Sequence, residues 1–249
     1  MTREVVHSRV ALLSMPRTGS TMITRQLSRH PSVFFVGALF SLEGWPGEGP
    51  GRRKVRTGLD ERWNDLTYRI AHHRELIEHV FAIDPDIPCV GFKHHLSGAR
   101  EVSEALLDDP RVAKIVVTRS NILACFSSEK TVRLKQSQAE GEAGPSKPLF
   151  VGEEFTKYLR IRRGHYAHWQ ERFEAVAGEL RTIEYTLART PGGMDGLMEF
   201  LGLKRLSLPQ LTRKRGSDDV TNRFANPEDV VNYLSAHGLQ DWSEEEAAN

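Results

Sequence analysis

Short apolar runs alternate along the chain with longer segments in which apolar residues recur at helical spacing. Residues 9–15 (RVALLSM), 89–93 (CVGFK) and 113–118 (AKIVVT) are typical of strands buried on both faces of a sheet. Residues 32–40 and 181–184 predict two further strands. Strands that alternate with helices predict an α/β fold, with a parallel sheet that has helices on both faces. We expect one domain over residues 1–249.

The segments between these strands carry helix signals. Residues 60–83 predict one long helix, because Trp63, Leu66, Ile70, Ile77 and Phe81 lie near helical spacing. A cap, a first-turn proline and two acids open the last helix at Asn226, and Gly238 ends it. The remaining helices are predicted at residues 21–30, 121–135, 153–178 and 192–201.

Two segments have no regular pattern. Residues 44–58 (GWPGEGPGRRKVRTG) are rich in glycine, proline and charge, and residues 136–148 have no apolar face. We expect both to be mobile loops, the second a flexible insert.

Composition excludes several classes of protein. The 249 residues carry 34 basic and 33 acidic side chains, which gives a net charge of +1. The protein as a whole therefore has no strong electrostatic field that would attract nucleic acid or an anionic membrane. The longest apolar run, residues 33–42, is too short to cross a bilayer, and the N-terminus does not resemble a signal peptide. Cys89 and Cys125 have no CxxC spacing, which disfavours a disulfide framework or a zinc site. We expect a cytoplasmic protein without a metal, for which a homodimer is one possible assembly.

The turn between the first strand and the first helix is the first candidate site. It reads Pro16-Arg17-Thr18-Gly19-Ser20-Thr21. A glycine there permits a tight turn, and the backbone N–H groups and hydroxyls that follow point toward whatever lies at the helix N-terminus. Arg17 adds a charge with bidentate geometry for oxyanions. The turn predicts a phosphate or sulfate cradle, although it lacks the lysine of a Walker A loop; the alternative is an ordinary polar cap.

A second candidate follows the strand at residues 113–118. Arg119 comes directly after it, at the edge of the sheet where ligands bind in α/β proteins, and Ser127 lies a little over two helical turns further on. An arginine and a hydroxyl on one groove would make a second anion site. The alternative is a surface arginine beside a half-buried helix serine.

Taken together, these motifs resemble those of sulfotransferases that use 3′-phosphoadenosine 5′-phosphosulfate (PAPS). Within that family they are most similar to the bacterial nodulation-factor type, which acts on carbohydrates. The turn at Arg17, Thr18, Gly19, Ser20 and Thr21 resembles their 5′-phosphosulfate loop, and Arg119 with Ser127 matches their 3′-phosphate site. The resemblance implies a P-loop-like sheet, PAPS as donor, 3′,5′-bisphosphate (PAP) as product and no metal. It also implies nucleotide contacts from Tyr185, Arg213, Lys214, Arg215 and Gly216.

The same resemblance implies in-line transfer of a sulfuryl group to a hydroxyl, or less readily an amine, of a carbohydrate or small natural product. Arg17 and Lys93 would neutralise the leaving group. His95 is one candidate for the base, since Lys93-His94-His95-Leu96 resembles a K-x-H-L segment of cytosolic sulfotransferases. Nodulation-type relatives use a glutamate where this chain has Ala38, and Glu43 is the nearest substitute.

Two alternatives stay open at this point. One is a small-molecule kinase with a P-loop-like fold, although no Walker lysine or acidic Mg²⁺ ligand is evident in the sequence. The other is a catalytically weakened nucleotide-binding relative, which the alanine at position 38 would suit.

Overall fold

The strands of the described residues form one parallel sheet with the order β2-β3-β1-β4-β5. The structure is a computed structural model that describes residues 7–41, 55–140, 145–208 and 217–245. Because β1 lies between β3 and β4, residues that follow these three strands meet at one edge of the sheet. The α/β prediction is confirmed. The strand bounds are Arg9–Ser14 (β1), Val33–Ala38 (β2), Cys89–His95 (β3), Ala113–Thr118 (β4) and Leu180–Glu184 (β5).

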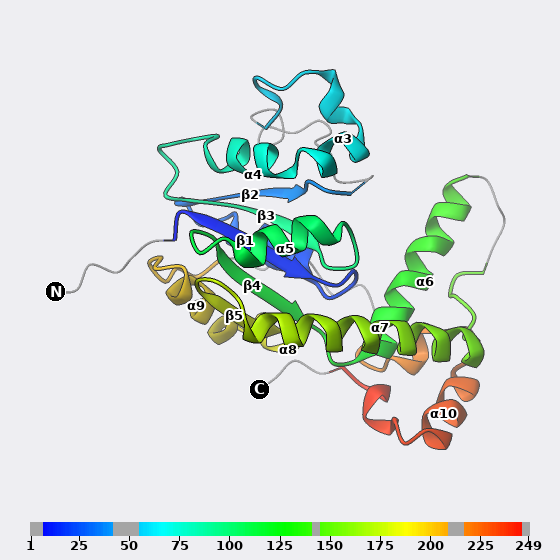
Figure 1. Cartoon of the computed structure of the whole chain (residues 1–249). Helices are drawn as coiled ribbons and strands as arrows, with labels where there is room; N and C mark the ends of the chain where they lie inside the picture. The colour runs from blue at the N-terminus through cyan, green and yellow to red at the C-terminus, as the bar shows by residue number, and fades with distance from the viewer. Residues whose placement is uncertain (1–6, 42–54, 141–144, 209–216, 246–249) are drawn as a thin grey trace.

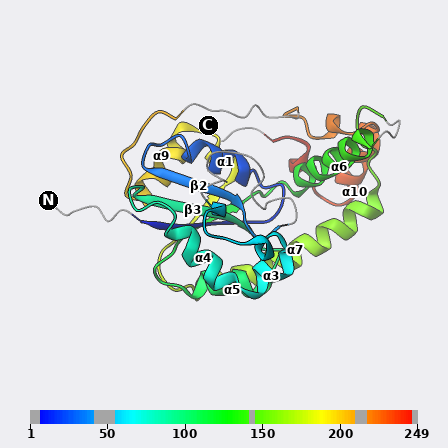
Figure 2. The same cartoon turned by 90° about the horizontal axis from the view of Figure 1, so that it is seen from above.

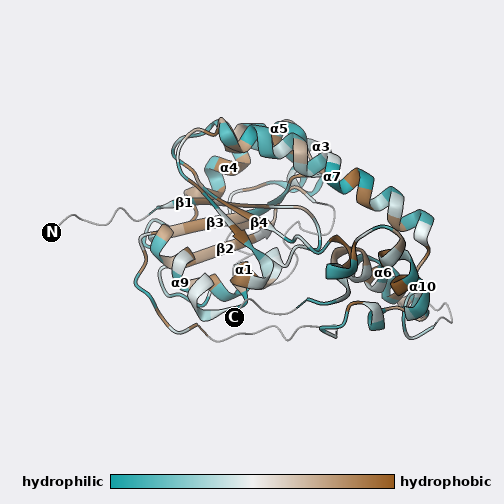
Figure 3. Cartoon of the chain, turned by 90° about the horizontal axis from the view of Figure 1, so that it is seen from below, coloured by the Kyte–Doolittle hydropathy of each residue, from teal (hydrophilic) through white to brown (hydrophobic). Residues whose placement is uncertain are grey.

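Helices cover both faces of the sheet (Figures 1 and 2). On one face Leu76, Leu106 and Trp169 share a core with the strands. They belong to α4 (His73–Phe81), α5 (Arg100–Asp108) and α7 (Gly152–Glu174). The opposite face packs on α1 (Ser20–Leu27), α8 (Tyr185–Ala188) and α9 (Pro191–Phe200). The apolar strands between these helix layers stand out in Figure 3.

A third core lies beyond the tips of the strands, where α6 (Ile122–Ala139), the first half of α7 and α10 (Pro227–Ala236) meet (Figure 1). We call it the aromatic cluster; at its centre Phe126, Phe150, Phe155 and Phe224 pack ring against ring. Two short 3-10 helices, η2 (Thr221–Arg223) and η3 (Gln240–Ser243), complete it. None of the helices that the structure describes is long and apolar enough to cross a membrane.

The single helix expected at residues 60–83 is wrong. The structure has η1 (Glu61–Asn64), α3 (Leu66–Ala71) and α4 in its place. Asp60 accepts a hydrogen bond from the Arg62 amide at 3.0 Å, and Asp65 accepts one from the Tyr68 amide at 2.7 Å. Asp60 caps the start of η1, Asp65 ends η1 and caps α3, and a second break between α3 and α4 falls at His72.

The two expected loops fall partly outside the described residues, at 44–54 and 141–144. The described remainder is more regular than expected. Val55 is fully buried in the core beside α4, and residues 136–139 continue α6 beyond its predicted end at Lys135.

Candidate functional site

The carboxyl ends of β1, β3 and β4 bring most of the predicted site residues together. The turn that holds Arg17 follows β1, Lys93 and His95 end β3, and Arg119 follows β4. Ser14 and His95 are partners in the β1–β3 register, and Ser14 and Val117 in the β1–β4 register. Sequence positions about 80 to 100 apart therefore meet at one edge of the sheet, where ligands bind in parallel α/β proteins.

The turn after β1 has an unusual backbone. Arg17 adopts a left-handed conformation with φ of 66°, which no other non-glycine residue in the described ranges does, and Gly19 follows with φ of 86°. Thr18 is fully buried, and its hydroxyl donates to the carbonyl of Met15 at 2.9 Å. A Cβ on Gly19 would lie 2.3 Å from Cδ2 of Tyr185, so the ring of α8 packs directly on the turn. Strain of this kind often marks a ligand-binding turn.

The N-terminus of α1 carries a second cation. Gly19 is its N-cap residue, Ser20 is buried, and Thr21 is exposed on the first turn. Lys93 reaches across from β3 and donates from Nζ to Oγ1 of Thr21 at 3.0 Å. The lysine therefore adds its charge to the positive end of the helix dipole.

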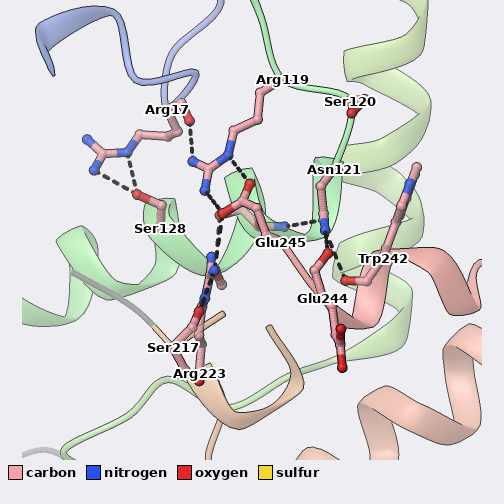
Figure 4. A network of polar contacts seen from close by, with 12 residues as sticks. Arg17, Arg119, Ser120, Asn121, Ser128, Ser217, Arg223, Trp242, Glu244 and Glu245 are labelled. Atoms are coloured by element: carbon pink, nitrogen blue, oxygen red, sulfur yellow. Dashed lines mark hydrogen bonds and ion pairs between the residues drawn. The ribbon is translucent and has the colours of Figure 1, made fainter. Parts of the chain in front are cut away.

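The Arg17 side chain points toward α6. Its Nε and Nη2 donate to Oγ of Ser128 at 3.0 and 2.8 Å (Figure 4). Burial is the main cause that lowers the pKa of Arg17, which starts from such a high value that the side chain stays charged. The sequence motif singled out the neighbouring Ser127, which is 1% exposed and donates to the carbonyl of Ala124 at 3.0 Å. The hydroxyl of Ser127 must leave that carbonyl to reach a ligand.

The two histidines of β3 point to opposite sides, as strand alternation predicted. His94 is buried, with Nε2 2.9 Å from Oγ of Ser103. His95 faces the site, with Nδ1 3.3 Å from Oγ of Ser14. Burial lowers the pKa of His95 to about 4, and the neighbouring charge of Lys93 acts in the same direction. His95 is therefore neutral at pH 7, as a general base must be.

Arg119 is held by a carboxylate from the C-terminal part of the chain. Its Nε donates to Oε1 of Glu245 at 2.6 Å and its Nη2 to Oε2 at 2.5 Å (Figure 4). Nη1 donates to the carbonyl of Arg17 at 2.9 Å, and the guanidinium carbon lies 4.3 Å from the centre of the Tyr185 ring. Burial acts to lower the pKa of Arg119, but the hydrogen bonds that it donates to Glu245, together with the charges of Glu245 and other neighbouring groups, outweigh this effect and raise the pKa.

Other contacts hold this C-terminal segment against the strand ends. Arg223 donates from Nη2 to Oε2 of Glu245 at 3.1 Å. Asn121 donates from Nδ2 to the carbonyls of Trp242 and Glu244 at 3.1 and 3.0 Å (Figure 4). Arg223 and Glu245 could not be identified from the sequence, since only the fold brings Glu245 against both Arg119 and Arg223. The candidate base Glu43 and the expected nucleotide ligands Arg213, Lys214, Arg215 and Gly216 lie outside the described residues.

A pocket lies at the opposite edge of the sheet, between α4, α5 and the start of β4. Its lining includes Arg111, Glu78 and Asp109. Arg111 donates to both carboxylates at 2.6 Å, so these charges compensate one another. Among the residues that the structure describes, no group of three or more histidine, cysteine or acidic side chains is arranged to hold a metal ion.

Comparison with solved structures places this geometry in a known fold. The sulfotransferase domain from the curacin biosynthetic pathway aligns with a TM-score of 0.51 over 94% of this chain and 88% of that domain, at 17% identity. A sulfotransferase from Mycobacterium avium aligns with a TM-score of 0.52 over 98% of this chain and 79% of the other, at 14% identity. No family model and no curated protein sequence matches the chain. The chain has the sulfotransferase fold that its motifs predicted.

Proposed function

We propose that this protein is a PAPS-dependent sulfotransferase that moves a sulfuryl group to a hydroxyl, or less readily an amine, of a carbohydrate or small natural product. One observation carries the proposal. Cationic side chains at the ends of both strands that flank β1 bind the turn that follows β1. Lys93, on β3, donates to the Thr21 hydroxyl, and Arg119, directly after β4, donates to the Arg17 carbonyl. A donor with phosphate groups at both ends of a ribose needs two such cationic sites close together.

In this proposal the turn binds the 5′ side of the donor. The amides of Ser20 and Thr21 lie in the first turn of α1 and have no partner further back in the helix. They suit the phosphosulfate, as do Arg17 and Lys93, which are placed to neutralise the bridging oxygen as the S–O bond breaks. Binding of the anion would release Arg17 from Ser128 and Lys93 from Thr21.

In this proposal Arg119 and Ser127 bind the 3′-phosphate of the donor. The segment with Arg213, Lys214, Arg215 and Gly216 is expected to close over that phosphate. Tyr185 supports both halves of the site, since its ring packs on Gly19 and on the guanidinium of Arg119. The nucleotide would thus lie across the ends of β1 and β4.

His95 is the proposed base. It is neutral at pH 7, it lies on the same side of β3 as Lys93, and Ser14 fixes the orientation of its ring. It would accept the proton of the acceptor hydroxyl as the oxygen attacks sulfur. Glu43 remains the alternative base.

Calorimetric titration tests the donor assignment. We expect adenosine 3′,5′-bisphosphate to bind at least about tenfold more tightly than adenosine 5′-phosphate, because the 3′-phosphate gains charge-assisted hydrogen bonds. Replacement of Arg119 by alanine, in a Glu245→Gln background so that no unpaired carboxylate is buried, should remove this difference. Arg133→Ala, at an exposed arginine that pairs with Glu129, is the control.

Two outcomes would contradict the proposal. Tight binding of ATP with Mg²⁺ and no response to the bisphosphate would favour a kinase. Binding of the bisphosphate without any transfer from labelled PAPS, across a broad panel of acceptors, would favour a nucleotide-binding relative without activity, which the alanine at position 38 would suit.

A further inference from the structure

The Glu245 carboxylate lies between two arginine side chains. It accepts hydrogen bonds from Nε and Nη2 of Arg119 at 2.6 and 2.5 Å and from Nη2 of Arg223 at 3.1 Å. The side chains of Glu245, Arg119 and Arg223 are 1%, 8% and 9% exposed. Two parallel N–H donors from one guanidinium are the arrangement by which arginine binds either a carboxylate or a phosphate.

Charge favours phosphate over carboxylate at this place. Within the described part of the chain, two buried guanidinium groups meet one carboxylate, which carries a single negative charge. A phosphate monoester near neutral pH carries between one and two negative charges and three acceptor oxygens. It can therefore neutralise both arginines and accept from each of them at once.

The position of the pair agrees with the proposed donor. Arg119 follows β4 and also binds the carbonyl of Arg17, so the carboxylate lies beside the turn that would hold the 5′ side. The segment that carries Glu245 is anchored independently of its side chain: the carbonyls of Trp242 and Glu244 accept from Asn121, and the amide of Glu245 donates to the carbonyl of Asp218. The carboxylate can rotate away while the segment stays in place.

We propose that Glu245 is an internal competitor that occupies the 3′-phosphate site of the empty protein, and that Arg223 is a further ligand of that phosphate. This inference rests on the proposed function. The donor displaces the carboxylate and takes over its contacts with Arg119 and Arg223. Since the competing carboxylate must first leave, the measured affinity for the nucleotide is lower than that of the open site.

The test compares Glu245→Gln with Glu244→Gln. The neighbouring Glu244 is exposed, so the second variant makes the same change in charge without opening the site. We expect Glu245→Gln to bind adenosine 3′,5′-bisphosphate about fivefold or more tightly than the wild type, and Glu244→Gln to match the wild type. Adenosine 5′-phosphate, which has no 3′-phosphate, should bind all three proteins equally.

Arg223 is tested in the Glu245→Gln background. Adding Arg223→Ala there should weaken bisphosphate binding about tenfold, as expected for a lost hydrogen bond between charged groups, and leave adenosine 5′-phosphate unaffected. If Glu245→Gln does not fold, Glu245→Asp serves in its place, because its shorter carboxylate grips Arg119 less well and should also tighten binding.

The outcomes separate the two proposals. Bisphosphate binding that is equal or weaker in Glu245→Gln than in Glu244→Gln would show that Glu245 only anchors the chain, and would overturn this inference while the proposed function stands. An unchanged affinity in the Arg223→Ala protein would remove Arg223 from the site. Failure of every protein, the wild type included, to bind the bisphosphate would overturn the proposed function and this inference with it.

Discussion

Ala38 near the end of β2 is the strand partner of Lys93 on β3. A side chain at position 38 would therefore stand beside the lysine that reaches the N-terminus of α1. This is the position at which the resembled nodulation-type enzymes carry a glutamate. The methyl group of Ala38 can accept no proton, whereas the imidazole of His95, the proposed base, lies two residues further along β3 than Lys93.

The first prediction concerns that base. His95→Ala should lower kcat for transfer from labelled PAPS by about 10²- to 10⁴-fold, the usual contribution of a general base, with little change in bisphosphate affinity. Ala38→Glu added to His95→Ala should restore part of the rate. A comparable loss in Glu43→Gln, with His95→Ala near normal, would assign the base to Glu43 instead.

The second prediction is a loss of stability in mild acid. Burial lowers the pKa of both His94 and His95 to about 4, below the ordinary histidine value of about 6.5 that applies to the unfolded chain. The unfolded chain thus binds protons first, so stability is complete above pH 6.5 and falls as the pH drops toward 4. Each ring contributes at most about 1.4 kcal/mol per pH unit.

Urea unfolding at pH 7.5 and pH 5 measures this effect. The loss of unfolding free energy between the two should shrink in His94→Gln, whose amide does not titrate. An identical loss in that variant and in the wild type would show that other groups cause it.

The third prediction concerns the turn after β1. Gly19→Ala should destabilise the protein by about 2 kcal/mol or more, because the new Cβ meets Tyr185 and because φ is 86°. Gly164→Ala on α7 is the control: nothing lies within 4 Å of its added Cβ, so it should stabilise by about 0.5–1 kcal/mol. Thermal unfolding of the two variants and the wild type measures these changes. A Gly19→Ala protein as stable as the wild type would contradict the described geometry of the turn.

The fourth prediction concerns Arg69, whose side chain is buried. It donates from Nη1 to the carbonyls of Trp63 and Asn64, each at 2.9 Å, and from Nη2 to that of Ser41 at 3.0 Å. Arg69→Met would leave these carbonyls without that donor and should cost about 3 kcal/mol of unfolding free energy. Arg62→Met, at an exposed arginine paired with Asp60, should cost less than about 1 kcal/mol. Similar losses of unfolding free energy in the two variants would argue against a structural role for the hydrogen bonds of Arg69.

The sequence was most informative where the chemistry is local. The turn from Arg17 to Thr21 could be predicted because a strand, a glycine and a helix start follow one another within a few residues. The side on which His95 lies could be predicted from strand alternation relative to Lys93. A local cap was also present in the sequence: Asp65 interrupts the helical pattern that appeared continuous, and its capping outweighs the hydrophobic spacing that favoured one helix.

The remainder of the site depends on tertiary structure. Arg119 and Glu245 are 126 positions apart, and only the return of the chain over the strand ends brings them together. The same holds for Arg17 and Ser128, where the motif had favoured the adjacent Ser127. The orientation of α6 about its own axis decides which of the two neighbouring serines faces the turn. The spacing of apolar residues alone does not determine that orientation to within one residue.

Arg119 also lies where the sheet meets the aromatic cluster. Through Arg17 and Tyr185 it holds the sheet side, and through Glu245 it holds the segment that packs into the cluster. A nucleotide phosphate held by Arg119 and Arg223 would take the place of Glu245 as the link between the two parts, so it should raise the midpoint of unfolding.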